Sequence, residues 1–519
     1  MTKIILAELA VIDPEGTPHV LHFSDEPMLP FAPDDAERPN QAYDPRLIDA
    51  ANISLDVFTD FDRLTSAAGG GAVTLSNNDG ALSYLRLFGF GSIDLYWGEA
   101  GDPFSAFVPL LKGRAASPLW QIAAAVAGRL TLPVHDKRAD LDTLIPANLY
   151  AGTNAGGGTG YEGTADGLKD TPKPLALGDL TAANLAAPWA NAEDRVAQLN
   201  DGAFEGIAAI YNGGGDAALT LSGLSTGASF DAATPAADEY EEDRVRGLVK
   251  FGSVLAGAVT FDLKGASDGG YDDTPAPLIR RLLKLAGADD AEIGASFSGF
   301  EAPEKAGLWV DTRRPAWEPV EALARSMGGW CLPDRLGLWQ LGRALPPIGE
   351  PAFELADDDI VDIAVDPAAP VDPVWRVTCL YARNYRVLSR GEMQGAVPGT
   401  ERESVVDREW RTATPAENAG TRARFPGARE LTVETALRHE ADAAALAARL
   451  LAFFGPRPDG AAKRLLRCAV LMTAEALALP LGAEVALSYA RDGIAANGIL
   501  LGIQPTWPRR NLVTLKVWI

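Results

Sequence analysis

Glycine and proline end short apolar or alternating segments along the whole chain. This frequent interruption is the feature that most constrains the fold. Glycine (52) and proline (36) together make up about a sixth of the 519 residues. Both residues supply turns between short strands, and both weaken the interior of a long helix. The sequence therefore predicts a mainly β protein with α/β insertions, rather than a protein built from long helices.

The length of the chain predicts several domains, because a single hydrophobic core stops growing near about 250–300 residues. The composition is globular, with 47% hydrophobic and 22% charged residues. Changes in texture along the sequence suggest four units. We expect a β-rich N-terminal domain at 1–115, a middle β domain at 116–265, an α/β domain at 266–365, and a C-terminal β domain with one long helix at 366–519.

The N-terminal unit carries several strand candidates. Residues 4–12 and 18–23 flank a Pro-Glu-Gly turn, and residues 72–76 alternate between apolar and polar side chains. In segment 92–98 the apolar side chains recur at a spacing of two, which places them on one face of a strand: Ile93, Leu95 and Trp97. These patterns predict a sheet with one buried face.

A glycine-rich segment lies in the middle unit, where seven of the sixteen residues 152–167 are glycine. Such a composition cannot hold a packed element, so we predict a surface loop that is dispensable for folding. A phosphate-binding loop would end in Gly-Lys-Ser/Thr, whereas Gly167 is followed by Leu168 and Lys169. The acidic run 238–243 is predicted to be a second exposed turn, between strand candidates at 206–211, 217–221 and 258–263.

The later part of the chain contains clearer signals for individual elements. We predict helices at 275–286, 317–327 and 433–454, a β-hairpin at 330–341, a strand region at 371–385, and closing strands at 484–489, 498–504 and 512–518. Thr274 is the expected cap of the first helix. The closing strands have one strongly apolar face, so we expect them to belong to a barrel that is closed or is completed by a neighbouring subunit.

The three cysteines, Cys331, Cys379 and Cys468, are far apart and form no Cys-x-x-Cys motif. A disulfide framework is therefore not expected, and the apolar surroundings of Cys379 and Cys468 predict that both are buried. The N-terminus lacks the apolar region of a signal peptide, and no run of about 18 apolar residues occurs. We expect no membrane insertion, and synthesis and folding in the cytoplasm.

The charge of the chain is strongly negative, with 46 Lys and Arg against 70 Asp and Glu, which gives a net charge of −24. Phosphate backbones repel such a surface, so sequence-specific or broad binding to nucleic acid is not expected. The acidity serves solubility, or it lines a passage that polyanions cross without sticking. Both interpretations remain open from the sequence.

Catalytic and metal-binding signals are sparse. The four histidines, His19, His22, His135 and His439, have no cysteine or carboxylate partner at the spacing of metal ligands. A serine or cysteine nucleophile would need one of them as a base, and neither Gly-x-Ser-x-Gly nor Cys-Gly-Ser-Cys is present. We predict no catalytic, cofactor-binding or metal-binding residues and no cofactor.

Clustered carboxylates leave one enzymatic alternative, a polysaccharide or peptidoglycan hydrolase with two acidic residues in an aromatic cleft. The clusters are Asp357–Asp359 with Asp362, Glu239 with residues 241–243, and Asp268 with Asp272 and Asp273. Tryptophans that could wall a cleft are Trp97, Trp189, Trp317, Trp330 and Trp339. We favour solvated turns as the interpretation of every cluster.

Three segments resemble tail-tip or baseplate hub-type proteins of long-tailed bacteriophages, including transposable and prophage-like siphophages. The first is 247–265, Gly-Leu-Val-Lys-Phe-Gly to Val-Thr-Phe-Asp-Leu-Lys-Gly. The second is the helix at 318–327 with Gly-Gly-Trp-Cys and the segment 334–342, Asp-Arg-Leu-Gly-Leu-Trp-Gln-Leu-Gly. The third is the C-terminal stretch from Leu481 to Trp518, and the resemblance is one of order and texture over most of residues 75–519.

This resemblance implies a non-enzymatic structural protein of the virion tail, made in the bacterial host cytoplasm. It implies barrel-like β-domains near the two ends of the chain, in 1–115 and 366–519. It also implies a homotrimeric ring that joins the tail tube to the tip, with other tail-tip, baseplate and tail-tube proteins as partners. The alternative from another class is a tail-associated protein whose exposed tryptophans and middle β-domain bind a host glycan.

Overall fold

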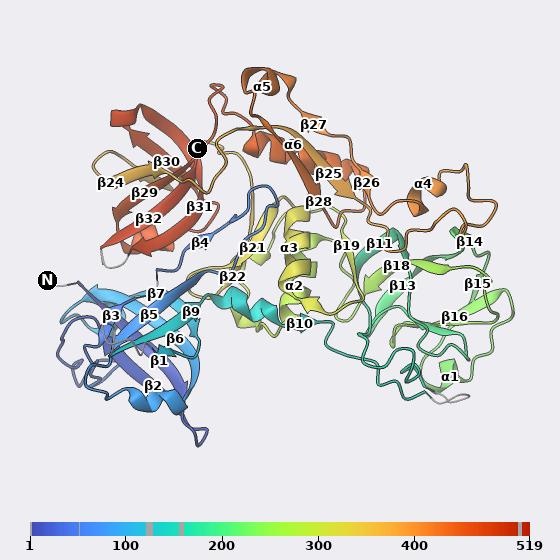
Figure 1. The fold of residues 1–519 in the computed structure, drawn as a ribbon, viewed down its shortest axis with the longest axis horizontal. Helices are drawn as coiled ribbons and strands as arrows, with labels where there is room; N and C mark the ends of the chain where they lie inside the picture. The colour runs from blue at the N-terminus through green and yellow to red at the C-terminus, as the bar shows by residue number, and fades with distance from the viewer. Residues whose placement is uncertain (1–2, 51, 121–127, 155–159, 507–510) are drawn as a thin grey trace.

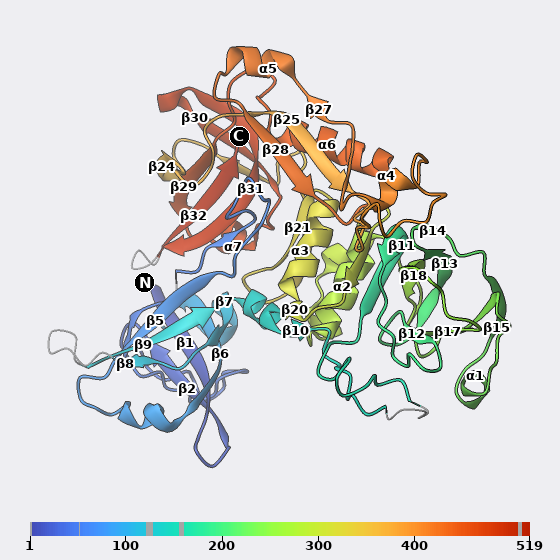
Figure 2. The ribbon, with the colours of Figure 1, turned by 45° about the vertical axis from the view of Figure 1, so that its right-hand side comes forward.

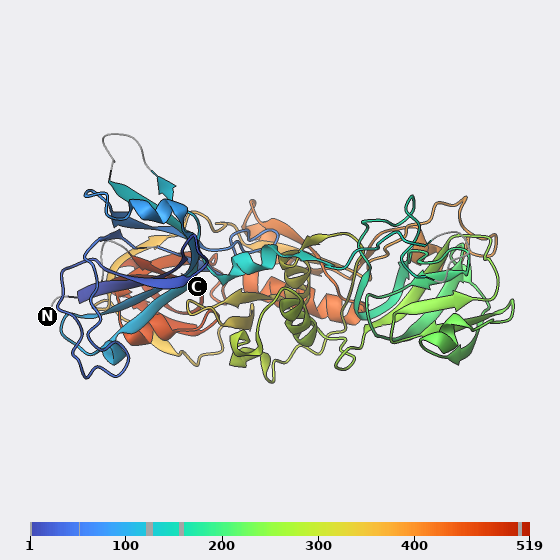
Figure 3. The same cartoon turned by 90° about the horizontal axis from the view of Figure 1, so that it is seen from below.

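The computed structural model describes residues 3–50, 52–120, 128–154, 160–506 and 511–519. The molecule is elongated (Figures 1 and 3). The first and last sheets lie together at one end, a smaller β domain forms the other end, and helical and mixed material connects them.

An eight-stranded sheet forms the N-terminal unit. Its strands are β1 (Lys3–Ile12), β2 (Pro18–Ser24), β3 (Leu47–Asp49), β5 (Gly70–Ser76), β6 (Gly89–Glu99), β7 (Val108–Ala115), β8 (Leu119–Trp120) and β9 (Arg129–His135). The hydrogen-bonded order is β2-β1-β6-β7-β9-β5-β3, with β8 beside β9. The four strand predictions in this unit are confirmed, and the sheet runs past the predicted boundary at 115 to include β9.

The pairing of β1 with β6 shows why this sheet buries one face. Ile93, Leu95 and Trp97 of β6 are all buried, and they stand opposite buried residues of β1. The pairs in register are Leu9 with Ile93, Ala7 with Leu95, and Ile5 with Trp97. Apolar side chains that face one another across antiparallel strands stabilise the sheet, as the spacing of two predicts.

A seven-stranded sheet contains the C-terminal strands. It comprises β4 (Leu55–Asp56), β23 (Phe353–Leu355), β24 (Ile360–Val365), β29 (Leu465–Leu471), β30 (Glu484–Tyr489), β31 (Ile494–Thr506) and β32 (Leu512–Trp518), in the order β23-β30-β31-β32-β29-β24 with β4 beside β31. The three closing strands are confirmed. β31 extends from Ile494 to Thr506, beyond both ends of the strand predicted at 498–504, and residues 507–510 lie outside the described part.

The two sheets share one hydrophobic core. A single cluster of buried residues contains Leu9, Val73 and Leu95 from the N-terminal sheet together with Cys468, Leu487 and Val513 from the C-terminal sheet. Each sheet is an open half-barrel, because its first and last strands pair with only one neighbour each in the described residues. Among the described residues, the C-terminal strands therefore do not close into a barrel of their own.

The middle β domain forms the far end of the molecule. One sheet has the order β14-β13-β18-β11-β19 and the other β12-β17-β16-β15. The strands are β11 (Leu175–Leu185), β12 (Val196–Gln198), β13 (Phe204–Asn212), β14 (Gly215–Asp216), β15 (Thr220–Leu224), β16 (Glu239–Asp243), β17 (Leu248–Phe251), β18 (Val259–Ala266) and β19 (Gly307–Val310), with the short helix α1 (Ala228–Asp231). The strands predicted at 206–211 and 258–263 are confirmed. The strand predicted at 217–221 is only partly correct, because residues 217–219 separate β14 from β15 and the strand begins at Thr220.

The α/β unit follows its predicted order. It contains α2 (Pro275–Leu285), α3 (Trp317–Ser326) and the hairpin of β21 (Gly329–Pro333) and β22 (Trp339–Arg343), with the short pair β10 (Leu144–Ile145) and β20 (Arg314–Pro315). Thr274 is the N-cap of α2, but its side chain makes no capping hydrogen bond. Both helices and the hairpin contribute to one core.

A further α/β unit lies above α3 (Figure 2) and divides the expected C-terminal domain in two. It contains β25 (Val374–Tyr381), β26 (Arg411–Thr412), β27 (Ala416–Glu417), β28 (Arg429–Glu434), α4 (Glu403–Val406), α5 (Ala419–Arg424) and α6 (Glu440–Phe454). The prediction of one helix over 433–454 is wrong in its first part, because Val433 lies in β28. This strand buries Leu431 and Val433 beside β25, and the helix begins only after His439.

Candidate interaction surfaces and predicted site residues

The acidic run 238–243 is not an exposed turn, which corrects the sequence prediction. It forms β16, an inner strand between β15 and β17, and the side chains of Glu242 and Asp243 are 0% exposed. Each buried carboxylate has an arginine partner in the turn that follows. Arg244 Nε lies 2.7 Å from Glu242 Oε2, and Arg246 Nε lies 2.6 Å from Asp243 Oδ2.

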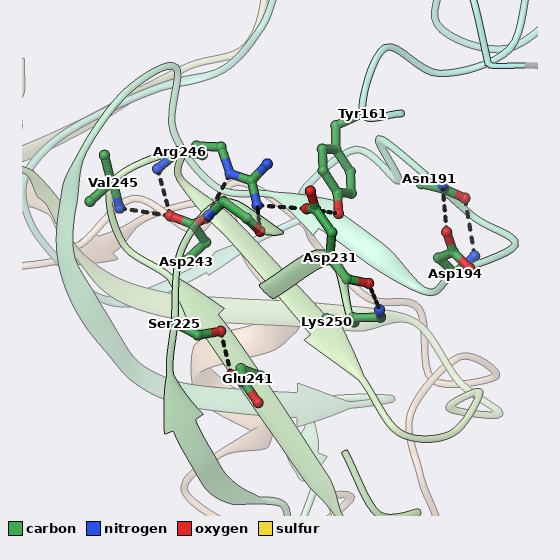
Figure 4. Close-up of polar contacts among 11 residues, drawn as sticks. Tyr161, Asn191, Asp194, Ser225, Asp231, Glu241, Asp243, Val245, Arg246 and Lys250 are labelled. Atoms are coloured by element: carbon green, nitrogen blue, oxygen red, sulfur yellow. Dashed lines mark hydrogen bonds and ion pairs between the residues drawn. The ribbon is translucent and has the colours of Figure 1, made fainter. Parts of the chain in front are cut away.

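Arg246 extends this pairing into a network that ties three segments together (Figure 4). Its Nη2 atom donates a hydrogen bond of 2.8 Å to Asp231 Oδ1 at the end of α1, and the hydroxyl of Tyr161 donates to the same oxygen at 2.7 Å. Burial raises the pKa of Asp231, but the hydrogen bonds from Tyr161 and Arg246 outweigh it, so the pKa is lowered. Asp231 and Asp243 are thus both held in ion pairs with Arg246.

The glycine-rich segment has no helix or strand in its described residues, 152–154 and 160–167, which agrees with the loop prediction. It is nevertheless fixed to the domain by hydrogen bonds. Gly163 N donates to Ala190 O at 2.9 Å, and the Asn154 side chain donates to the same carbonyl at 2.7 Å. Residues 155–159 lie outside the described part of the chain.

The remaining carboxylate clusters also serve turns and ion pairs. Asp357, Asp358 and Asp359 lie in an exposed turn, as predicted, and Asp359 accepts a hydrogen bond from the backbone of Ala356 at 3.0 Å. Asp362 is also exposed but lies on β24. In the other cluster, Asp273 pairs with Lys305 at 2.7 Å.

Histidines and cysteines do not assemble a reactive centre in the described residues. His19 pairs with Asp13 at 2.9 Å, and His22 lies 3.8 Å from Glu8. Within the described ranges, no group of three or more His, Cys, Asp or Glu side chains could hold a metal ion. All three cysteines are buried, and burial raises the pKa of the Cys468 thiol to about 12.

The tryptophans lie in separate units of the molecule. Trp97 is buried in the N-terminal sheet, and Trp330 and Trp339 are buried in the hairpin of the α/β unit. Trp317 starts α3. Trp189 of the middle domain is 38% exposed and packs on Phe251, with ring centroids 5.7 Å apart.

The two half-barrels have open edges, of which the one at β2 is bridged only near its end, where Ser24 N donates to Asp44 O at 2.9 Å. The outer strands are β2 and β3 in one sheet and β23 and β24 in the other. Apolar side chains on these strands are exposed, including Val20 on β2 and Val361 and Val365 on β24. An outer strand with unpaired N–H and C=O groups and exposed apolar residues can pair with another chain.

Buried polar groups join the middle domain to the unit that contains β25. Asp262, which is 3% exposed, accepts hydrogen bonds from the backbone N–H groups of Ala182 (2.7 Å), Ala183 (2.9 Å) and Asn184 (2.9 Å). The Asn184 side chain in turn donates to Asn384 at 3.2 Å. The sequence analysis did not predict this contact between the two units.

No described helix is long and apolar enough to cross a membrane. No family model and no curated protein matches the sequence.

Solved structures of tail proteins match this chain along nearly its whole length. A tail protein of Neisseria meningitidis MC58 has 13% identity and a TM-score of 0.39, and the match covers 99% of this chain and 96% of that one. A 43 kDa tail protein of the MuSo2 prophage of Shewanella oneidensis has 9% identity and a TM-score of 0.39, over 99% and 98% of the two chains. A prophage tail protein of Listeria monocytogenes EGD-e has 8% identity and a TM-score of 0.37, over 99% and 94%.

Proposed function

We propose that this chain is a structural subunit of a bacteriophage tail tip or baseplate, of the hub type. In this role it forms a symmetric ring in the virion tail, between the tail tube and the parts that recognise the host. One observation carries the proposal: two open half-barrels share a single core at one end of the molecule, and the outermost strands of each pair with only one neighbouring strand in the described residues.

Pairing between copies would satisfy these edges. A head-to-tail contact between different surfaces closes into a ring when the rotation between copies is a whole fraction of a turn. Each chain contributes two half-barrels, so three copies place six sheets around an axis. This arrangement suits a homotrimer that meets a six-fold tube on one side and a three-fold tip on the other.

The acidity of the chain fits a ring that DNA crosses. With a net charge of −24, we propose that Asp and Glu side chains are enriched on the surface that faces the axis. A negative lumen repels phosphate and lets the polyanion pass. A neutral or basic lumen in a reconstruction of the ring would contradict this part of the proposal.

We assign the chain no catalytic role. The support is that several of the carboxylates proposed as candidates for hydrolysis are engaged in turns or in ion pairs, such as Asp243, which is 0% exposed and pairs with Arg246.

The proposal is tested by native mass spectrometry and negative-stain microscopy of the purified chain. We expect rings of three copies, and the chain should copurify with tail-tube and tip proteins from particles. A chain that stays monomeric and is absent from purified tails would overturn the proposal. The half-exposed Trp189 favours glycan binding as the second candidate, and saturable binding on a glycan array that a Trp189→Ala variant loses would support it.

A further inference from the structure

The outermost strand of the middle domain has one edge without a partner strand. β15 ends the sheet β12-β17-β16-β15, and among the described residues it pairs only with β16. It lies at the end of the molecule opposite to the two half-barrels (Figures 1 and 2). The outer edge of such a strand presents backbone N–H and C=O groups with which a further strand can pair.

The side chains of β15 are also accessible. Leu221 is 42% exposed and Leu224 is 57% exposed. The strand contains neither a proline nor a charged residue, two features that protect edge strands from pairing with another chain. It is five residues long and has a register shift between Leu221 and Gly223, so its edge suits a short segment. A segment that pairs there would cover apolar surface as well as satisfy the backbone.

The chain around β15 is acidic. Residues 217–243, which run from just before β15 to the end of β16, contain six Asp and Glu residues and no Lys, Arg or His. Arginines that follow β16 neutralise three of the six, namely Asp231, Glu242 and Asp243. The charge that remains is therefore negative.

The other three acidic side chains lie next to β15 without a basic partner. Asp238, Glu239 and Glu241 form no ion pair within the described part of the chain. Glu239 stands in register with Thr220 of β15, and Glu241 with Gly223. Because side chains alternate along a strand, the two glutamates lie on the same face of β16.

The carboxylate of Glu241 lies over β15 itself. A β-carbon at Gly223 would be 3.5 Å from its Oε1 atom and 3.7 Å from its Oε2 atom, and the hydroxyl of Ser225 donates to it (Figure 4). Lys250 stands opposite Glu241 on β17, but its ammonium donates to the backbone carbonyl of Asp231 at 3.1 Å. No side chain at Gly223 separates this carboxylate from the next strand position, about 4.8 Å further out.

We propose that the edge of β15 docks a short basic segment of a partner protein, which extends the sheet as a fifth strand. Lysine or arginine side chains alternate with apolar ones in this segment. Backbone hydrogen bonds to a sheet edge hold such a segment, and the alternate side chains give specificity. Its basic side chains lie on the face of Glu239 and Glu241, and its apolar ones cover the opposite face. The edge is remote from the half-barrels, so this docking goes beyond the structural role proposed above and does not depend on ring formation.

The test is fluorescence anisotropy on the full chain with a labelled peptide of alternating lysine and valine. We expect saturable binding that a peptide of alternating glutamate and valine does not show. A lysine–valine peptide with methylated backbone nitrogens cannot donate to the edge and should bind at least about tenfold more weakly. The variant Leu221→Lys with Leu224→Lys should also lose binding, because lysine on an edge strand opposes pairing and here repels a basic segment.

A pair of charge variants separates the site from general attraction to an acidic protein. Glu239→Gln with Glu241→Gln should weaken binding about fivefold, because both charges face the segment. Asp358→Asn with Glu430→Gln removes the same charge at exposed positions elsewhere and should leave the affinity unchanged.

Circular dichroism and thermal melting establish that each variant is folded. If the glutamate variant does not fold, the comparison of the two lysine–valine peptides on the wild-type chain decides the matter. Absence of saturable binding, equal affinities of the two charge variants, or equal affinities of the two lysine–valine peptides would overturn the proposal. Self-association of the chain that Leu221→Lys with Leu224→Lys abolishes would assign the edge to a second copy and would also overturn it.

Discussion

At the scale of single residues, buried carboxylates position the backbone and the loops of this protein. Asp243 fixes the turn that contains Arg246 through hydrogen bonds from the backbone N–H groups of Val245 and Arg246, at 3.1 and 3.0 Å. Asp262 does the same for residues 182–184 of β11, where Ala182 and Asn184 have positive φ angles of 53°. Both carboxylates accept hydrogen bonds from backbone N–H groups that would otherwise lack an acceptor.

Replacing Asp262 with alanine should strongly destabilise β11. The change leaves three backbone N–H groups without their acceptor, two of them buried and one part-buried, which costs on the order of 3 kcal/mol or more. We expect the free energy of opening of the β11 amides, measured by hydrogen exchange, to fall by about that amount. The matched control is Asp362→Ala on the exposed face of β24, which should change it by less than about 0.5 kcal/mol. Equal effects of the two changes would contradict the role of Asp262.

Glu8 should give the N-terminal sheet a pH-dependent stability. Burial raises its pKa, but hydrogen bonds from Arg38 (2.8 and 2.9 Å) and Tyr43 (2.6 Å) outweigh burial and lower the pKa below 4.5. A carboxylate with a lowered pKa stabilises the fold above its unfolded pKa, and the contribution disappears as the pH falls through the folded pKa. Glu8→Gln should therefore lower Tm at pH 7, and the difference from the wild type should shrink below pH 4.5. A difference that is independent of pH would show that Glu8 acts through packing alone.

The residue types of the buried positions were only partly predictable. The apolar surroundings of Cys379 and Cys468 correctly predicted burial. The run 238–243 was predicted to be an exposed turn because consecutive acidic residues normally lie in solvent. The signal that was overlooked is the pair of arginines directly after the run, which neutralise Glu242 and Asp243. Asp262 gave no local signal, since its partners lie about 80 residues away in the chain.

At the scale of elements, alternation and turn residues predicted strands well, and helix boundaries less well. Leu431 and Val433 alternate with polar residues and pair with β25, a pattern that a helix prediction over 433–454 overlooked. The parallel pairing of β28 with β25 depends on contacts that are distant in sequence, so periodicity could not reveal it. The end of α6 at Gly455 was predictable from the glycine that follows the apolar run, whereas its start was not.

Deleting β32, residues 512–519, should prevent correct folding of the C-terminal half-barrel. This strand is an inner one, paired with β29 on one side and β31 on the other, and it carries the buried Trp518. Loss of that side chain alone removes about 2–3 kcal/mol of burial. We expect aggregation or failure to enter tails, as judged by sedimentation and by incorporation into particles. Sedimentation of the truncated chain like the wild type would show that the strand is peripheral.

Shortening the glycine-rich segment should be tolerated when the change is confined to residues 155–159. Loop shortening changes the closure entropy by only about 0.6 kcal/mol per twofold change in length. The flanking contacts of Asn154 and Tyr161 are retained in this design. We expect soluble expression and an unchanged Tm, and the control Tyr161→Phe, which removes the hydroxyl bound to Asp231, should lower Tm. Loss of soluble expression on shortening would contradict the prediction of a dispensable loop.

At the scale of the whole molecule, the ends of the sequence meet in space. The first and last sheets share one core, and β4 from the N-terminal region pairs with β31 near the C-terminus. The sequence predicted β-rich units at both ends but not their contact, because surface complementarity between sheets leaves no local pattern. The division of 366–519 into a half-barrel and a separate α/β unit was hidden for the same reason.

The central claim is that the paired half-barrels build a ring in the tail. A cryo-electron microscopy reconstruction of purified tail particles tests this claim most directly. The account predicts three copies around the axis, with strands at the open edges, such as β24 or β2, paired with a neighbouring copy. Density that places the chain outside any ring, or that leaves these edges in solvent, would contradict the account.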